Sequence, residues 1–384
     1  MTLSNRIDIE ARERETLASY AALAAESRGR VFPQTEHPLR TAFQRDRDRI
    51  VHSTAFRRME YKTQVFLPHE GDHLRTRLTH SIEVAQISRT MARCLRLNED
   101  LTEAIALVHD LGHTPFGHSG EDVLNDLLKN SGGFNHNLQS LRVVDLLEQR
   151  YPEYPGLNLT YEVREGIVKH ETWKRIAHPD FTEADHPTLE ASLVDTADEI
   201  AYNGHDIDDG IRAGMITLDE VRKLAIWRAE PDGFKNPFTS GHNFDSLSQD
   251  QKRYAVVRFL VNLMVTDVLI ETEKQIDRFD ISSVDSVRHA PEKICRYSAE
   301  IARLVAELKA FLMEHVYRNE QLVRKAERAE RIMRMLFEKF RENPKLMPER
   351  FQEMLLTEDT EIVIADYIAG MTDRYAEKRY EELI

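Results

Sequence analysis

The chain has 384 residues, of which 41% are hydrophobic and 31% charged, so it can bury the core of one large domain or two. Its formal net charge of −14 argues against broad, sequence-independent binding to nucleic acid, which depends on Lys and Arg neutralising phosphates, but permits a phosphate substrate held by local arginines and a cation. No stretch approaches the roughly 18 uninterrupted apolar residues of a membrane helix, and the charged N-terminus is unlike a secretory signal, so we expect a cytoplasmic protein.

Helical periodicity dominates the chain. Gly (15) and Pro (13) are scarce for this length, and apolar residues recur mostly at intervals of three and four. We therefore predict an all-α protein with almost no strands. The arginine-rich stretch over 40–58 fits a local phosphate-binding field and, equally, an exposed helix of mixed charge.

The first informative helix is predicted over 78–95. Its buried face is expected to consist of Ile82, Ala85, Ile87, Met91 and Leu95. A second helix starts near Glu103 and ends just before Gly112. The glycine-rich loop LGHTPFGHSG follows, and the next helix is predicted to start near Ser119, a residue type that caps helix N-termini well.

The remaining pattern alternates loops and helices. We expect loops over 131–137 and 151–158, and helices over 189–202 and 253–273. A long surface loop is predicted over 226–250. One or two long amphipathic helices are predicted over 298–342, where Ala, Leu, Glu, Lys and Arg recur with helical spacing.

Residues that can carry chemistry gather at three places: His80, the pair His109-Asp110, and the acidic segment DTADEIAYNGHD over 195–206. Imidazole and carboxylate groups bind divalent cations such as Mg²⁺, Mn²⁺, Fe²⁺ or Zn²⁺, whereas two isolated cysteines suggest no thiolate site. Adjacent helical residues project about 100° apart, so the His109-Asp110 pair can face one metal only near a helix end. The sequence thus predicts three helices that aim ligands at one point.

The acidic segment has a continuous helical face. Intervals of three and four residues place on it Asp195, Asp198, Tyr202 and Asp206. Such a face is usually solvated, but apolar residues on both sides of it favour a packed helix.

The loop after His109 is unusually rich in titratable groups. Between Gly and Pro residues it carries His109, Asp110, His113, His118 and Glu121. A single histidine is more often a surface or core residue than a ligand. This density, which packing alone rarely requires, favours a functional site.

The string HDLGHTPFGHSGE, preceded by RLTHS and followed by TADEIAY, resembles the HD-domain deoxynucleoside triphosphate triphosphohydrolases, and closely the bacterial dGTPase-like proteins. The similarity extends through FRRMEYKTQVF (56–66), GGFNHN (132–137) and GLNLTYEV (156–163). It covers roughly residues 40 to 210, whereas the C-terminal half matches only in general helical character.

The resemblance implies an HD-domain helical bundle with a divalent metal ion, whether Mn, Mg, Fe, Ni or Zn, held by His80, His109, Asp110 and Asp198. Asp198 is preferred over Asp195 because the family's metal-binding aspartate lies four residues before a substrate-facing tyrosine, here Tyr202. The resemblance also implies that His118 is the catalytic histidine beside the α-phosphate, with Glu121 fixing its tautomer.

Substrate contacts carry over in the same way. Arg77 would face the phosphates, Gln64 the base or sugar, and Tyr202 and Asp206 the sugar and its phosphates. His113 and His136 would line the phosphate pocket or stabilise the loop by hydrogen bonds. Arg58 would be a phosphate contact or a salt-bridge partner.

The implied reaction is attack of an activated water on the α-phosphorus of a deoxynucleoside triphosphate, which releases the deoxynucleoside and intact triphosphate. Two alternatives stay open: another HD-superfamily activity, such as a nucleotidase or phosphodiesterase, and a nucleotide-sensing regulator without turnover. The preferred base and the native metal are not specified by the sequence.

The same resemblance suggests a division of the chain and its assembly. Residues 1–74 would form an N-terminal arm carrying substrate-pocket residues, 75–210 the metal-dependent phosphohydrolase domain, and 211–384 a C-terminal helical region that packs on the core and on other subunits. We expect a homo-oligomer; the resemblance implies a tetramer or hexamer, which in some relatives binds a nucleotide activator at a subunit interface.

Overall fold

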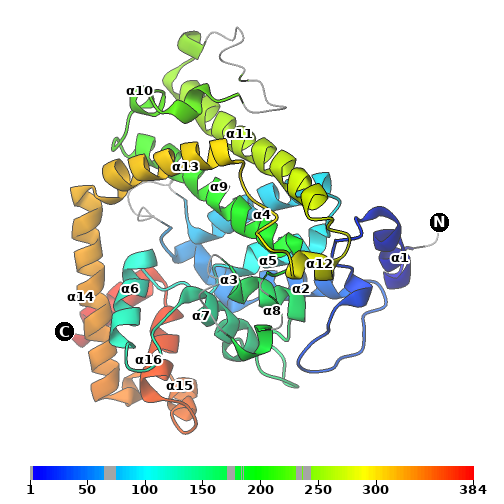
Figure 1. The fold of residues 1–384 in the computed structure, drawn as a ribbon. Helices are drawn as coiled ribbons and strands as arrows, with labels where there is room; N and C mark the ends of the chain where they lie inside the picture. The colour runs from blue at the N-terminus through cyan, green and yellow to red at the C-terminus, as the bar shows by residue number, and fades with distance from the viewer. Residues whose placement is uncertain are drawn as a thin grey trace.

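The structure is a computed structural model that describes residues 3–64, 75–170, 178–182, 184, 186–230, 236 and 244–384. The described residues form helices and loops without a β-strand, and only three isolated β-bridges occur among them. The all-α prediction is confirmed. Figure 1 shows the longest helices crossing the middle and upper part of the molecule, with the C-terminal helices grouped at one side.

The N-terminal and central part contains nine α-helices within the described residues: α1 (Arg6–Thr16), α2 (Ala42–Val51), α3 (Thr54–Arg58), α4 (Arg77–Cys94), α5 (Glu99–Val108), α6 (Gly117–Leu127), α7 (His136–Arg142), α8 (Tyr161–Val168) and α9 (Leu189–Arg212). The C-terminal part continues with α10 (Leu218–Val221), α11 (Gln249–Arg278), α12 (Val284–Arg288), α13 (Ala299–Leu312), α14 (Glu320–Glu342), α15 (Glu349–Met354), α16 (Thr360–Ala369) and α17 (Asp373–Leu383).

Helices α4, α5 and α9 are packed together and supply the framework for the HD motif. Helix α4 begins at a capping box, in which the Thr76 side chain accepts from the backbone of Thr79 and the Thr79 side chain accepts from the backbone of Thr76. Its apolar face is buried as predicted except at Ile82, which is half exposed because it lies on the outer side of the helix.

Helix α6 starts earlier than the sequence predicts. We expected Ser119 to cap it, but the helix begins at Gly117, and Phe116 and Gly117 both adopt left-handed backbone conformations with φ of 64° and 62°. A left-handed pair therefore makes the turn, and no side chain caps this helix. The hydroxyl of Thr114 donates to the Gly117 carbonyl at 3.0 Å across the turn.

Several predicted helices are longer than expected. The helix predicted over 189–202 continues as α9 to Arg212, and the one predicted over 253–273 is the longer α11. The segment over 298–342 forms two helices, α13 and α14, as one of the two expected arrangements. Much of the loop predicted over 226–250 falls outside the described residues, and the described parts include two short 3₁₀ turns.

The apolar side chains form two clusters. The larger one joins helices α2, α4, α5, α8, α9, α11 and α13. The smaller one joins α6 to α14 and α16. Residues 109–116, between α5 and α6, form the HD loop. The helix that follows this loop therefore packs against the C-terminal helices. The division at residues 74 and 210 stays a prediction.

Polar contacts reinforce this link between the HD loop and the C-terminus. The buried ammonium group of Lys62 donates to the carbonyl oxygens of His113 and Ala369. The buried Asp373 carboxylate accepts from the backbone N–H of Thr63 at 2.9 Å and of Phe116 at 3.0 Å.

Gly112 lies at a tightly packed point of the HD loop. A Cβ atom at this position would lie 2.2 Å from the Ser140 backbone nitrogen and 2.3 Å from the His136 carbonyl oxygen. Helix α7 therefore leaves no room for a side chain.

We predict that Gly112→Ala lowers the free energy of unfolding by about 2–3 kcal/mol, because the clash involves backbone atoms that cannot rotate away. Urea denaturation of the full chain measures it. Gly210→Ala in α9 is the control, because its added Cβ would meet only side-chain carbons, at 3.2 Å. Equal stability losses in the two variants would contradict this reading of the loop.

Candidate active site

Three helices bring the predicted metal ligands together. His80 lies on α4, His109 and Asp110 follow the last residue of α5, and Asp198 lies on α9. The Nε2 atom of His80 is 2.7 Å from Oδ1 of Asp198, and Nε2 of His109 is 3.7 Å from the same oxygen. His80, His109 and Asp110 are buried, and the Asp198 side chain is 14% exposed. The four predicted metal ligands therefore form one cluster.

The hydrogen bond behind His109 leaves its other ring nitrogen available. Nδ1 of His109 is 2.7 Å from the carbonyl oxygen of Ala106, and a carbonyl oxygen only accepts, so Nδ1 carries the hydrogen. Nε2 is buried without a hydrogen-bond partner among the described residues, and it lies 3.5 Å from Oδ1 of Asp110. Burial opposes a charge on this ring, but Asp110 and Asp198 raise the pKa of His109 to about 9, so Nε2 binds a proton or, in its place, a divalent cation.

The two carboxylates are held in their charged form. Burial alone would raise the pKa of Asp198, but the nearby imidazoles of His109, His170 and His80 hold it well below its usual range. Burial likewise opposes the charge on Asp110, and the nearby His109 and Arg77 outweigh it and lower the pKa of this group. Ionised carboxylates together with imidazole nitrogens are the donor set that a hard or borderline metal prefers.

His170 joins this cluster although the sequence analysis did not select it. Its Nε2 atom is 3.5 Å from Oδ2 of Asp198, and its ring centroid lies 4.9 Å from that of His109. His170 follows the end of α8, within the segment that begins with the matched string GLNLTYEV. The sequence feature that could have identified His170 is its position just past the end of a helix, which is also the position of His109.

Asp195, the reserve choice for the metal ligand, lies near the cluster but has a different partner. Its carboxylate forms an ion pair with Lys293, and its Oδ1 atom is 3.8 Å from Nδ1 of His170. Asp198 instead lies within 4 Å of three histidines, including His80. The geometry supports Asp198 over Asp195.

A second cluster surrounds Glu121 on α6. Nδ1 of His136 is 2.9 Å from the Glu121 carboxylate, whereas the ring nitrogens of His113 and His118 are 3.8 Å and 3.7 Å away. The rings of His113 and His136 stack with centroids 4.0 Å apart. Glu121 therefore engages His136 more closely than His118, whose side chain is 60% exposed.

Asp110 connects the two clusters. Its Oδ1 atom is 3.1 Å from Nε2 of His113, and its Oδ2 atom accepts from Nη1 of Arg77 at 3.0 Å. Burial and the nearby Arg77 and His136 lower the pKa of His113 well below its usual range, so its imidazole is neutral.

Two predicted substrate residues have buried polar atoms without protein partners. Among the described residues, Nε and Nη2 of Arg77 and Oε1 of Gln64 make no hydrogen bond although they are buried. Both residues pack next to the start of α6, because a Cβ on Gly117 would be 3.4 Å from Nη2 of Arg77 and 3.3 Å from the Gln64 carbonyl. Buried polar atoms left unpaired in this way favour a bound polar ligand.

Tyr202 and Asp206 lie farther along α9. The ring of Tyr202 stacks on that of Tyr317 with centroids 6.1 Å apart, and the Tyr317 hydroxyl donates to the Asp206 carboxylate. Burial and the neighbouring Asp209 raise the pKa of Asp206 well above its usual range. The site of Asp206 therefore favours the neutral form of its carboxyl group.

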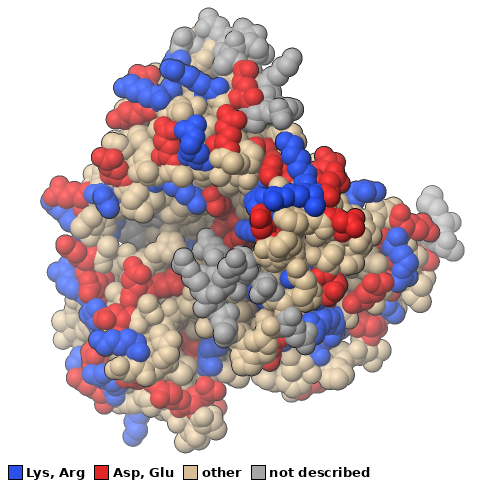
Figure 2. Space-filling view, in the orientation of Figure 1, with Lys and Arg blue, Asp and Glu red and all other residues tan. Residues whose placement is uncertain are grey.

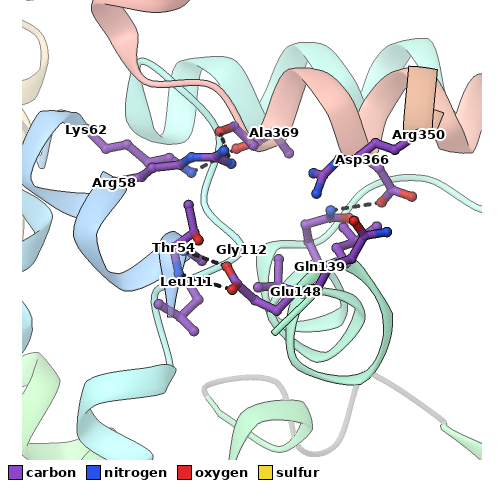
Figure 3. A pocket seen from close by; sticks show the side chains of 15 residues that line it. Thr54, Arg58, Lys62, Leu111, Gly112, Gln139, Glu148, Arg350, Asp366 and Ala369 are labelled. Carbon is purple, nitrogen blue, oxygen red and sulfur yellow. Dashed lines mark hydrogen bonds between the residues drawn. The ribbon is translucent and has the colours of Figure 1, made fainter. Parts of the chain in front are cut away.

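Arg58 does not lie with the other predicted substrate residues. It lines a cavity of about 180 Å³ behind the HD loop, together with Lys62, Gly112 and Arg350, and its Nη1 atom donates to the Gly370 carbonyl at 3.0 Å. Figure 3 shows the guanidinium groups of Arg58 and Arg350 facing this cavity. None of the clustered imidazoles or carboxylates lines it.

The face of the molecule drawn in Figure 2 carries a mixed pattern of charge. Figure 2 shows acidic and basic side chains interspersed over the visible face, without one dominant basic patch. None of the described helices is both long and apolar enough to span a bilayer.

Comparison with known proteins identifies the family. The HD domain family model matches residues 77–203, and the phosphohydrolase-associated domain model matches residues 295–382. A deoxyguanosinetriphosphate triphosphohydrolase-like protein of Geobacter metallireducens is 45% identical over 99% of this chain and 98% of its own length. Proteins of the same name from Geobacter sulfurreducens and Ralstonia pickettii are 46% and 48% identical over 97% and 96% of this chain, and over 96% and 94% of their own lengths.

The chain belongs to the deoxyguanosinetriphosphate triphosphohydrolase-like family. The relatives match nearly the whole length of this chain. The C-terminal helices are therefore part of the family's fold, in addition to the HD domain. This family assignment agrees with the resemblance found in the sequence, and the HD-domain match supports a metal-dependent phosphohydrolase.

Asp206 allows the cost of ionising a buried carboxyl group on α9 to be tested. We predict that Asp206→Asn raises the midpoint of thermal unfolding at neutral pH by a few degrees, since about 1 kcal/mol corresponds to roughly 2–4 °C in a chain of this size. The raised pKa in the folded protein means that ionisation of Asp206 costs stability.

The sign of the pH dependence follows from that shift. Below the ordinary aspartate pKa both proteins carry a neutral group, so their unfolding midpoints should agree. The advantage of the variant should grow as pH rises above that value. Calorimetry at several pH values measures this, and a variant that is less stable than the parent at neutral pH would contradict the assignment.

Proposed function

We propose that this protein hydrolyses deoxynucleoside triphosphates to deoxynucleoside and inorganic triphosphate with a divalent metal ion held by His80, His109, Asp110 and Asp198. The observation that carries the proposal is the bare, buried Nε2 atom of His109, which faces two ionised carboxylates. The names of the full-length relatives supply the substrate class.

When bound, the cation would supply Lewis acidity toward the phosphoryl oxygens and would lower the pKa of an attacking water. Arg77 contributes a fixed positive charge beside it, with two nitrogens still free to donate to phosphate oxygens. Because Arg77 is nearly fully buried, its charge acts on the phosphates with little screening by water.

The cluster around Glu121 would handle the proton. His118 is exposed at the start of α6, where it can donate a proton to the leaving 5′ oxygen of the deoxynucleoside. Glu121 orients His136 directly, and the stacked ring of His113 lies between His136 and Asp110. We assign Glu121, His113 and His136 to positioning the phosphates and His118.

Substrate recognition would use both sides of the cluster. Gln64 offers a buried acceptor near Arg77, while Tyr202 and Asp206 present a tyrosine and a carboxyl group on α9 for the sugar. Arg58 is left out of this set because it faces the cavity behind the loop.

The first experiment is chromatography of each of the four deoxynucleoside triphosphates incubated with the full-length protein and Mn²⁺ or Mg²⁺. We expect the deoxynucleoside and triphosphate to appear in equal amounts. His109→Ala should abolish turnover, because it removes Nε2, the ring nitrogen that the hydrogen bond from Nδ1 to Ala106 leaves for the metal ion.

Asp195→Asn serves as the matched control, and it should retain far more activity than Asp198→Asn. Release of monophosphate or diphosphate would indicate another phosphate-ester hydrolase. A protein that binds metal and nucleotide without turnover would indicate a nucleotide sensor.

A second experiment separates His118 from the metal ligands. We predict that His118→Ala lowers kcat by about 10²–10⁴-fold, the usual contribution of a general acid, while the metal content stays unchanged. The side chain is mostly exposed, so folding should be preserved. Asp122→Ala, an exposed neighbour on α6, is the control. Loss of bound metal in the His118 variant would contradict this role.

The expected homo-oligomer and its nucleotide activator stay predictions. Helix α14 has a polar outer side along most of its length, and its buried residues face α6 and α16. Sedimentation of the purified chain with and without nucleotide measures the assembly.

A further inference from the structure

A further histidine lies behind His80, on the side opposite Asp198. His205 comes from α9, and its Nδ1 atom is 3.1 Å from Nδ1 of His80. Both residues are buried, with 1% and 6% of their surface exposed, and their rings meet edge to face with centroids 5.2 Å apart. Two ring nitrogens at this distance share one hydrogen, so one ring donates and the other accepts.

The contact continues outward to Glu83. The other ring nitrogen of His205, Nε2, is hydrogen-bonded to the Glu83 carboxylate. Nε of Arg75 donates to that carboxylate at 2.9 Å, and Nη1 of Arg75 is 2.9 Å from carboxylate oxygens of both Asp208 and Asp209. Arg75 therefore keeps Glu83 charged and fixes its place.

The direction of each hydrogen bond from Glu83 through His205 to His80 follows from the charge on the Glu83 carboxylate. A carboxylate only accepts, so Nε2 of His205 carries a hydrogen and donates it to Glu83. The neutral His205 ring then has a bare Nδ1, which accepts from Nδ1 of His80. That assignment leaves Nε2 of His80, 2.7 Å from Oδ1 of Asp198, to be joined to the carboxylate by an exchangeable proton or by a metal ion.

That last pair requires a cation. A ring nitrogen without a hydrogen and a carboxylate oxygen repel one another unless a proton or a metal ion joins them. His109 reaches the same tautomer through a backbone carbonyl, which no substitution can remove. His80 depends on side chains, which can be replaced one at a time.

We propose that Glu83 and His205 form a positioning relay that keeps the hydrogen of His80 on Nδ1 and its Nε2 atom free to bind the metal. The inference rests on the proposed function, because it assigns the relay to the metal site of that function. Neither residue touches the substrate or the metal.

The placement of the relay along the chain supports this role. Glu83 lies three residues after His80 on α4, and His205 lies seven residues after Asp198 on α9. Each helix thus carries one metal ligand and one relay residue on the face that meets the other helix. The relay fixes both the tautomer of His80 and the alignment of α4 with α9 at the site.

The test measures Mn²⁺ affinity of the full-length protein by electron paramagnetic resonance, without nucleotide. Outer partners of metal-binding histidines usually contribute 10–100-fold to affinity. We expect His205→Leu to weaken Mn²⁺ binding by that factor. His205→Gln should recover much of the loss, because its amide can accept from His80 and donate to Glu83.

Glu83→Ala provides an independent variant at a side chain that is 43% exposed, so it should fold even if His205→Leu does not. We expect about tenfold weaker Mn²⁺ binding. Gln86→Ala, one turn along α4 and exposed, is the control and should bind Mn²⁺ like the parent.

Wild-type affinity in both His205→Leu and Glu83→Ala would overturn the relay. So would a Gln variant that binds no better than the Leu variant, because a purely space-filling role would not distinguish them by hydrogen bonding. Parallel assays of triphosphate release separate the two proposals. If the variants lose Mn²⁺ as expected while the parent hydrolyses no deoxynucleoside triphosphate, the relay stands and the proposed function fails.

Discussion

A histidine can bind a metal ion only through a ring nitrogen that carries no hydrogen, and the interior of this protein is arranged around that constraint. The Ala106 carbonyl holds the hydrogen of His109 on Nδ1. The end of α5 must therefore place one more residue in helical geometry beyond Val108, while Gly112 lets α7 pack directly behind the loop. Helix packing and ligand chemistry are in this respect one requirement.

Burying so many charges is the second requirement. An isolated buried carboxylate costs several kcal/mol, so each needs a nearby cation or hydrogen-bond donors. The carboxylates along α9 find theirs on other elements: Asp195 pairs with Lys293, and Asp208 pairs with Arg75 and Arg253. The acidic helix is buried because partners from 45 to 133 residues away converge on it. Asp206 accepts from the Tyr317 hydroxyl, but burial and the neighbouring Asp209 outweigh that bond and raise its pKa.

The sequence predicted the helices and the central cluster well, since both depend on local patterns. Periodicity located α4 and α5, and the crowded HD loop with the matched family strings identified the residues now found together. What it missed depends on contacts between distant segments. His205 and Glu83 look like ordinary helical residues until α4 and α9 are packed, and Arg58 lies in a matched string yet faces away from the site. The start of α6 was misplaced because two left-handed residues make the turn where a serine cap was expected.

The contacts between the HD loop and the C-terminus affect how the protein matures. All four proposed metal ligands lie before residue 200, whereas the loop that carries His113 is fastened by Ala369 and Asp373. During synthesis on the ribosome, the helices that carry the ligands therefore emerge long before the residues that complete the loop. A chain that stops short of α16 keeps every ligand but leaves Lys62 without one of its two acceptors. Premature termination before α16 would thus leave every ligand in the chain but the loop without its C-terminal contacts.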